Sequence, residues 1–156
     1  MAFTVSNDYI TGVKPVPTPS GPEVLATRFT LALATGDLAL NTIGQVGVLP
    51  AGCLPVEVRV DGADLDSGAG AGVYQVGILD TAGTAMSSAA ADGGGAWGDT
   101  GTAVATAFDK ALTRTLNNMA NVTSSGSDRK LGLKVTTAPS TAVAGTIGVT
   151  LFYKAA

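Results

Sequence analysis

Apolar and polar residues alternate with period two along much of the chain from Glu23 onward. Successive side chains of a β-strand point to opposite faces, so each such run has one apolar face and one weaker face. The pattern predicts strands, and the runs are residues 28–34, 54–61, 74–79, 131–136 and 147–154. The run over 54–61 is the most regular, because Leu54, Val56, Val58 and Val60 alternate with less apolar neighbours.

The predicted core includes ten of the apolar members of these runs. They are Leu31, Leu33, Val56, Val58, Val76, Ile78, Leu133, Val135, Val149 and Leu151. A charge placed among them would be buried without a partner, so the substitution Val58→Asp tests this assignment.

Glycine-rich segments separate the runs. Residues 67–72, 80–83, 92–95 and 124–128 have the composition of turns and loops. Residues 102–119 are the one helix candidate, but β-branched residues interrupt them and no apolar stripe of helical period emerges, so they are interpreted as strand or irregular structure. The chain is therefore predicted to be all-β, with a single antiparallel β-sandwich or jelly-roll-like domain over residues 23–156.

Residues 1–22 have a different pattern. Between Lys14 and Pro22 the sequence is rich in proline, which removes backbone donors and favours extended backbone. We expect an extended Pro-rich N-terminal arm that either stays disordered or orders against a partner. The candidate partner-binding residues are Phe3, Val5, Tyr9, Ile10, Pro15, Pro17 and Pro19. A domain that starts at Glu23 is then expected to fold with almost the full melting temperature.

The charge content of the chain limits the classes of partner that it can bind. The chain has 156 residues, of which 13% are charged, and its net charge is -3 with no basic cluster. Nucleic-acid binding and polybasic membrane binding both need such a cluster, so neither partner is expected. So few charges favour burial of some surface in an assembly, and we expect a homotrimer. In their predicted strands, Leu79 and Phe152 lie on the face opposite the main row of apolar residues. A neighbouring copy is expected to cover them there.

Targeting signals are not expected. The first eight residues have no basic residue and no apolar core of a signal peptide. The uncharged stretch 38–56 contains glycines and prolines, so it is interpreted as strand, turn and strand rather than a membrane helix. Cys53 is the single cysteine, which excludes an intramolecular disulfide and fits folding in a reducing cytoplasm.

Catalytic chemistry is hard to place on this sequence. The chain has no histidine, which removes Ser-His-Asp triads, Cys-His dyads and histidine metal ligands. Cys53 is interpreted as a small buried hydrophobic residue. Asp61, Asp64 and Asp66 resemble a calcium loop faintly, but turn capping explains them as well and is preferred. We expect no enzyme activity, no metal and no cofactor.

Aromatic residues are few. Sugar-binding modules stack sugar rings on exposed aromatic side chains, and this chain has one tryptophan, three tyrosines and four phenylalanines. Trp97 follows the glycines at 93–95. It either folds back as a lid over one end of the core or serves as a candidate partner anchor on a loop.

The turn-and-strand pattern of residues 45–154 resembles a known family. The segments that carry the resemblance are Leu49–Gly52, Asp64–Gly70, Asp80–Ala85, Ser127–Val135 and Gly145–Tyr153. They are similar to the small structural proteins encoded among the head genes of tailed bacteriophages, some of which decorate or cement capsids. The N-terminal arm lies outside the resemblance.

Two functions remain open. The resemblance implies a non-enzymatic virion protein that is made in the bacterial host cytoplasm, binds the major capsid protein on the outer capsid surface and stabilises the shell. The alternative is a carbohydrate- or receptor-binding β module of a head fibre or tail. The number of copies per particle separates them, since decoration needs many copies and a tail tip few.

Overall fold

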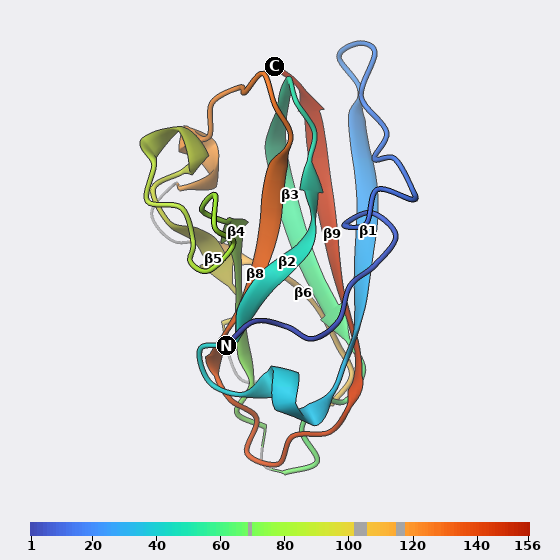
Figure 1. Ribbon diagram of the computed structural model, residues 1–156, viewed down its shortest axis with the longest axis vertical. Helices are drawn as coiled ribbons and strands as arrows, with labels where there is room; N and C mark the ends of the chain where they lie inside the picture. Colours follow the sequence, from blue (N-terminus) through green and yellow to red (C-terminus); the bar gives the residue numbers. More distant parts are fainter. Residues whose placement is uncertain (69, 102–105, 115–117) are drawn as a thin grey trace.

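The computed structural model is a sandwich of two β-sheets that face each other across one core (Figure 1). It describes residues 1–68, 70–101, 106–114 and 118–156. All strand pairings within the two sheets are antiparallel in these ranges, and helix is limited to single 3-10 turns. These turns are η1 (Thr35–Leu38), η2 (Ala90–Asp92) and η3 (Met119–Asn121). The predicted all-β antiparallel sandwich is confirmed.

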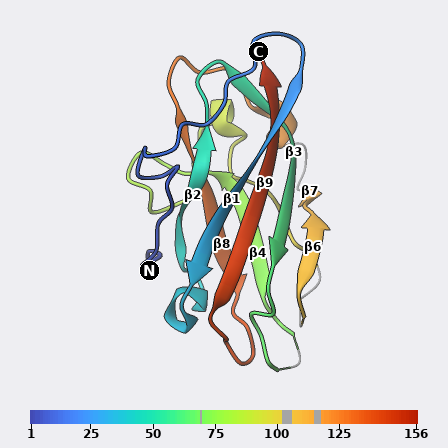
Figure 2. The same ribbon diagram turned by 90° about the vertical axis from the view of Figure 1, so that its right-hand side faces the viewer.

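Each sheet takes strands from both ends of the chain. The first sheet has the order β1 (Val24–Leu33), β9 (Gly145–Ala155), β3 (Cys53–Gly62) and β6 (Phe108–Ala111). The second has the order β2 (Ile43–Leu49), β8 (Arg129–Thr137), β4 (Val73–Ile78), β5 (Ala96–Asp99) and β7 (Thr113–Arg114). Figure 2 looks onto the outer side of the first sheet.

The pairing is nested. β1 pairs with β9, β2 with β8, β3 with β6 and β4 with β5, and alternate pairs go to opposite sheets. A long hairpin that has been rolled up gives this arrangement, which is the jelly roll. The predicted jelly-roll-like domain is therefore also correct.

The core lies between the sheets and contains every predicted core residue except Val56. Its largest fully buried side chains include Trp97, Tyr74, Tyr153 and Phe29. Along the strands, the buried core residues alternate with residues that face outward, as the period-two pattern requires. Burial of this apolar surface is the main contribution to the free energy of folding.

Val56 is the incorrect assignment, and a β-bulge in β3 explains it. In the pairing of β3 with β9, Pro55 opposes Tyr153 and Glu57 opposes Phe152, so the register shifts by one residue at Val56. A bulge of this kind changes which side chains face the core. Before the bulge Cys53 and Pro55 take the core side, and Val56 is 36% exposed.

Two further interpretations from the sequence can be compared with the structure. Residues 35–62 form η1, β2, a turn and β3, so the uncharged stretch is strand, turn and strand as expected. No helix in the described ranges is long and apolar enough to cross a membrane. In the interval 102–119, the described part contains β6 and β7, whereas residues 102–105 and 115–117 lie outside the described residues.

Leu79 is covered by its own chain. It lies just beyond β4, where it packs against Gly132 and forms a bridge with Met86, and it is buried. A side chain on Gly132 would clash with Leu79, so the close approach requires glycine there. The expectation that a neighbouring copy covers Leu79 is therefore wrong. Phe152 remains partly exposed on the outer side of the first sheet.

Candidate interaction surfaces

Cys53 and the acidic loop have structural roles. Cys53 is buried in the core, and burial raises the pKa of its thiol, which disfavours the thiolate that nucleophilic chemistry needs. Asp64 accepts a hydrogen bond from the Asp66 amide at 3.1 Å, which is a turn-capping contact, and Asp61 pairs with Arg28. The described residues contain no cluster of three or more potential metal ligands.

Asp66 ties two loops together. Its buried carboxylate accepts hydrogen bonds from the backbone amides of Gly68 (2.9 Å), Ala71 (2.9 Å), Ser140 (2.8 Å) and Thr141 (2.8 Å). Burial by itself would raise the pKa of Asp66, but these amides lower it well below its ordinary value. The preferred interpretation as capped turns is correct for Asp64 and Asp66, whereas Asp61 forms an ion pair with Arg28 instead.

Trp97 lies in the core. Its side chain is 1% exposed, and its indole nitrogen donates a hydrogen bond to the Asp92 carbonyl at 2.9 Å. The side chain folds back over the core, as one interpretation has it, but Trp97 lies on strand β5 and not on a loop. In this conformation the indole offers no surface to a partner, so a partner-anchoring role would require it to turn outward.

The N-terminal segment, residues 1–22, packs against the sandwich along the open side between the edge strands β1 and β2 (Figure 1). Ala2 forms a parallel bridge with Ile43 of β2, and the Ile43 amide donates to the Met1 carbonyl at 2.9 Å. Phe3 packs on Gly44, where a Cβ would come within 2.8 Å of its ring. The segment thus extends the second sheet at its β2 edge.

Asn7 joins the two sheets. Its amide nitrogen donates to the Thr30 carbonyl of β1 at 3.1 Å and to the Val46 carbonyl of β2 at 2.8 Å. Its amide oxygen accepts from the backbone amides of Tyr9 and Ile10, both at 3.1 Å. One side chain therefore holds both edge strands and the turn that follows it.

Asp37 holds the segment near its start. The buried carboxylate accepts hydrogen bonds from the Thr4 amide at 2.8 Å, the Thr4 hydroxyl and the Ala34 amide. Burial favours a higher pKa for Asp37, but these donors outweigh it and the pKa is lowered. Tyr9 adds an edge-to-face contact with Phe29, with ring centroids 4.9 Å apart.

The predicted partner-binding residues of this segment fall into two groups. Phe3, Val5, Tyr9 and Ile10 are partly buried against the protein's own core. Pro15 and Pro17 are exposed, and Pro19 is half-buried. The Pro17 carbonyl accepts a hydrogen bond from the Tyr153 hydroxyl at 2.6 Å. The role of these seven residues in binding a partner stays a prediction.

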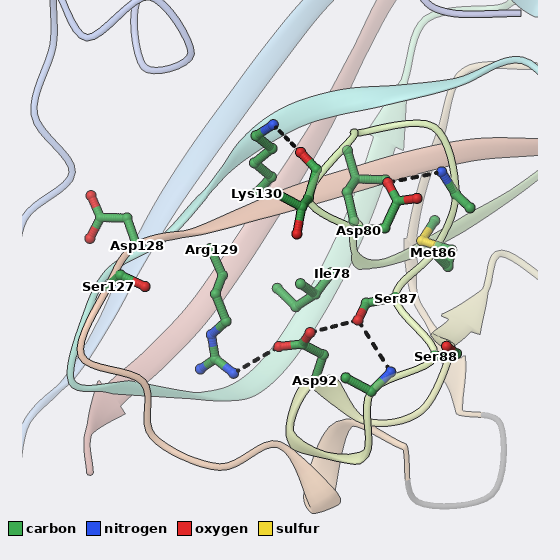
Figure 3. Close-up of a pocket in the computed structure, with 14 residues that line it drawn as sticks. Ile78, Asp80, Met86, Ser87, Ser88, Asp92, Ser127, Asp128, Arg129 and Lys130 are labelled. Carbon is green, nitrogen blue, oxygen red and sulfur yellow. Dashed lines mark hydrogen bonds and ion pairs between the residues drawn. The ribbon is translucent and has the colours of Figure 1, made fainter.

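A polar hollow of about 700 Å³ lies between the loop after β4 and the start of β8 (Figure 3). Arg129 and Asp92 form an ion pair across it at 3.3 Å, and the Ser87 hydroxyl donates to Asp92 at 2.6 Å. Lys130 donates to the Thr81 carbonyl at 3.0 Å. These side chains bind one another and position the loop, while the buried Nε of Arg129 has no hydrogen-bond partner among the described residues.

The outer side of the first sheet is a further exposed surface. Its β1 edge runs beside the N-terminal segment, and Arg28 on β1 pairs with Asp61 on β3 across β9. Arg59 on β3 pairs with Asp109 on β6 at 3.0 Å. On this side the alternation pattern indicated only Phe152, because the rest of its composition depends on which strands pair.

Comparisons with known proteins point to phage capsids. A chain of the capsid of Ralstonia phage GP4 is 27% identical, with a TM-score of 0.69 over 96% of both chains. A chain of the cyanophage Pam1 capsid asymmetric unit is 16% identical, with a TM-score of 0.54 over 92% of both chains, and shares the fold. No family model and no curated protein matches the sequence.

The fold and the match to the GP4 capsid chain support one class of protein. That class is the structural proteins of bacteriophage heads, as the sequence resemblance implied. A virion location and a structural role follow from the same similarity.

Proposed function

We propose that the protein decorates the outside of a bacteriophage capsid, where it binds the major capsid protein and stabilises the shell. The observation that carries the proposal is the similarity to a chain of the Ralstonia phage GP4 capsid along almost the whole of both chains. We further propose that the protein acts as a homotrimer, is made in the host cytoplasm and adds to the shell from outside.

The surface chemistry supports a binding role. The protein is small, weakly charged and rich in sheet, and its buried carboxylates Asp37 and Asp66 are engaged in loop contacts. The exposed prolines of the N-terminal segment are a candidate attachment site. Proline restricts the unbound chain, so its docking on a shell costs less conformational entropy than docking of a flexible peptide.

The carbohydrate- or receptor-binding alternative is less well supported. A sugar platform needs aromatic rings open to solvent, and all eight aromatic side chains of this protein are buried or half-buried. The large exposed apolar side chains among the described residues are aliphatic, and they are Met1, Val13, Val24, Leu40, Val56 and Val143.

The first experiment compares particles with and without the protein. Quantitative mass spectrometry of purified virions should find it in many copies, at a constant ratio to the major capsid protein. Shells assembled without it should form and then open at a lower temperature, and the added protein should restore the wild-type value. Antibodies against the protein should label intact heads.

Each part of this experiment has an outcome that contradicts decoration. A few copies per virion, with label confined to the tail, would favour the receptor-binding alternative. Failure of any shell to form without the protein would show that it builds the shell instead of decorating it.

A further inference from the structure

The bulge in β3 places apolar side chains outside the core. Leu54 and Val56 belong to a run whose pattern predicts that both face inward, but the bulge moves them out of the core row. Leu54 opposes Lys154 on the outer side of the sheet, and Val56 is 36% exposed. Bulges commonly re-aim side chains beside functional surfaces.

Other apolar residues gather at the same end of this sheet. In register, Val24 lies beside Lys154, and Ala26 lies beside Phe152, which in turn opposes Glu57. Val24 is 51% exposed, and Phe152 is partly exposed. We define the outer patch as Val24, Ala26, Leu54, Val56 and Phe152. It lies at the end of the sheet where the chain terminates, which faces the viewer at the top of Figure 2.

The charges around the outer patch balance. On this side of the sheet three cations face three anions, and they are Arg28, Arg59, Lys154, Glu57, Asp61 and Asp109. Arg28 pairs with Asp61, and Arg59 with Asp109 and Glu57. The whole chain carries a net charge of -3, so the excess negative charge lies on other surfaces.

We propose that the outer patch binds a second copy of this chain, and so forms the contact between protomers in the trimer of the proposed function. Two acidic copies repel each other, and the repulsion is smallest where the facing surfaces carry no net charge. Here an apolar patch stands within such a neutral surface, so its burial stabilises a contact between like-charged copies. The inference rests on the self-association included in the proposed function.

Two valines with matched exposure test the proposal. Val56 in the outer patch is 36% exposed, and Val143, in the loop between β8 and β9, is 37% exposed. Sedimentation velocity of the full chain over a range of micromolar concentrations should show an oligomer for wild type and for Val143→Asp. Val56→Asp should sediment as a monomer, with self-association weakened by at least about tenfold. Far-ultraviolet circular dichroism should confirm that both variants are folded.

The proposal is overturned if wild type sediments only as a monomer, or if Val56→Asp assembles as wild type does. Binding to particles that lack the protein distinguishes this failure from failure of the proposed function. A monomeric wild type that binds particles, with binding lost in Val56→Asp, would show that the outer patch faces the shell. No particle binding by wild type would refute decoration itself, whatever the oligomeric state.

Discussion

Single buried side chains decide both the register and the loop structure of this protein. Val58 of β3 is 1% exposed and opposes Leu151 of β9 within the core. Asp66 is equally buried, but its carboxylate is surrounded by backbone donors. The same burial therefore excludes a charge at one position and stabilises it at the other.

The first prediction concerns Val58. Val58→Asp should lower the free energy of unfolding by about 3 kcal/mol or more, because the carboxylate would be buried without a donor. Val143→Asp is the control, since Val143 is exposed and its substitution should cost little. Urea unfolding followed by circular dichroism measures both. An unchanged midpoint for Val58→Asp would contradict the register of β3.

The second prediction concerns Asp66 and pH. Because the folded-state pKa of Asp66 is lowered, its ionised form stabilises the fold above the pKa of the unfolded chain, about 3.9. This contribution to stability is lost as the pH falls from the pKa of the unfolded chain through the lowered pKa of the folded state. Asp66→Asn should lower the melting temperature at pH 7. In this variant the melting temperature should also fall less steeply than in wild type as the pH is lowered.

Asp64→Asn is the matched control for Asp66, because Asp64 is exposed and accepts only one backbone hydrogen bond in the described structure. Its melting temperature should stay close to that of wild type from pH 7 into acid. Asp37 and Asp80 also have lowered pKa values, so some acid sensitivity should persist in Asp66→Asn. A pH profile for Asp66→Asn identical to wild type would contradict the assigned role.

At the scale of elements, the N-terminal segment behaves as part of the sandwich. β1 and β2 are edge strands of different sheets, and residues 1–22 cover the side between them. Uncovered edge strands expose unpaired backbone groups that invite association with other chains. The N-terminal segment therefore protects an edge of its own domain, whether or not it also binds a partner.

The third prediction follows from this placement. Removal of residues 1–22 should lower the melting temperature clearly, since Phe3, Asn7 and Tyr9 lose their contacts. This result would reverse the expectation that a domain starting at Glu23 keeps nearly the full melting temperature. Thermal melts of the two chains measure the difference, and coincident melts would mean that the segment contributes little.

A single substitution tests the same element more finely. Asn7→Ala should lower the free energy of unfolding by about 1–3 kcal/mol, because two carbonyls and two amides lose their partner. Asn121→Ala serves as control, since Asn121 is exposed on the η3 turn. Equal stability of the two variants would argue against Asn7 as a link between the sheets.

At the scale of the whole molecule, both sheets and the N-terminal segment share one apolar core. We therefore predict one cooperative unfolding transition. Trp97 is the single tryptophan and lies in the second sheet, so its fluorescence should change with the same midpoint as circular dichroism of the whole chain. An earlier fluorescence transition would show that the second sheet unfolds separately.

Local pattern determined much of this protein in advance. Period-two alternation identified five strands, β1, β3, β4, β8 and β9, and nine of the ten predicted core residues, of which Leu133 and Val149 are typical. Glycine-rich turns predicted the antiparallel sandwich, and the absence of histidine with a single cysteine argued against catalytic chemistry. These features depend on residues near one another in the chain, so the sequence alone is enough to read them.

Tertiary structure decided what depends on distant partners. The bulge at Val56 exists because β3 pairs with β9 almost one hundred residues later, and no local pattern reports that shift. The cover of Leu79 over Gly132 and the docking of Asn7 between β1 and β2 are equally non-local. A strand's own alternation specifies that one face is apolar, but only the pairing partners determine which face each side chain finally takes.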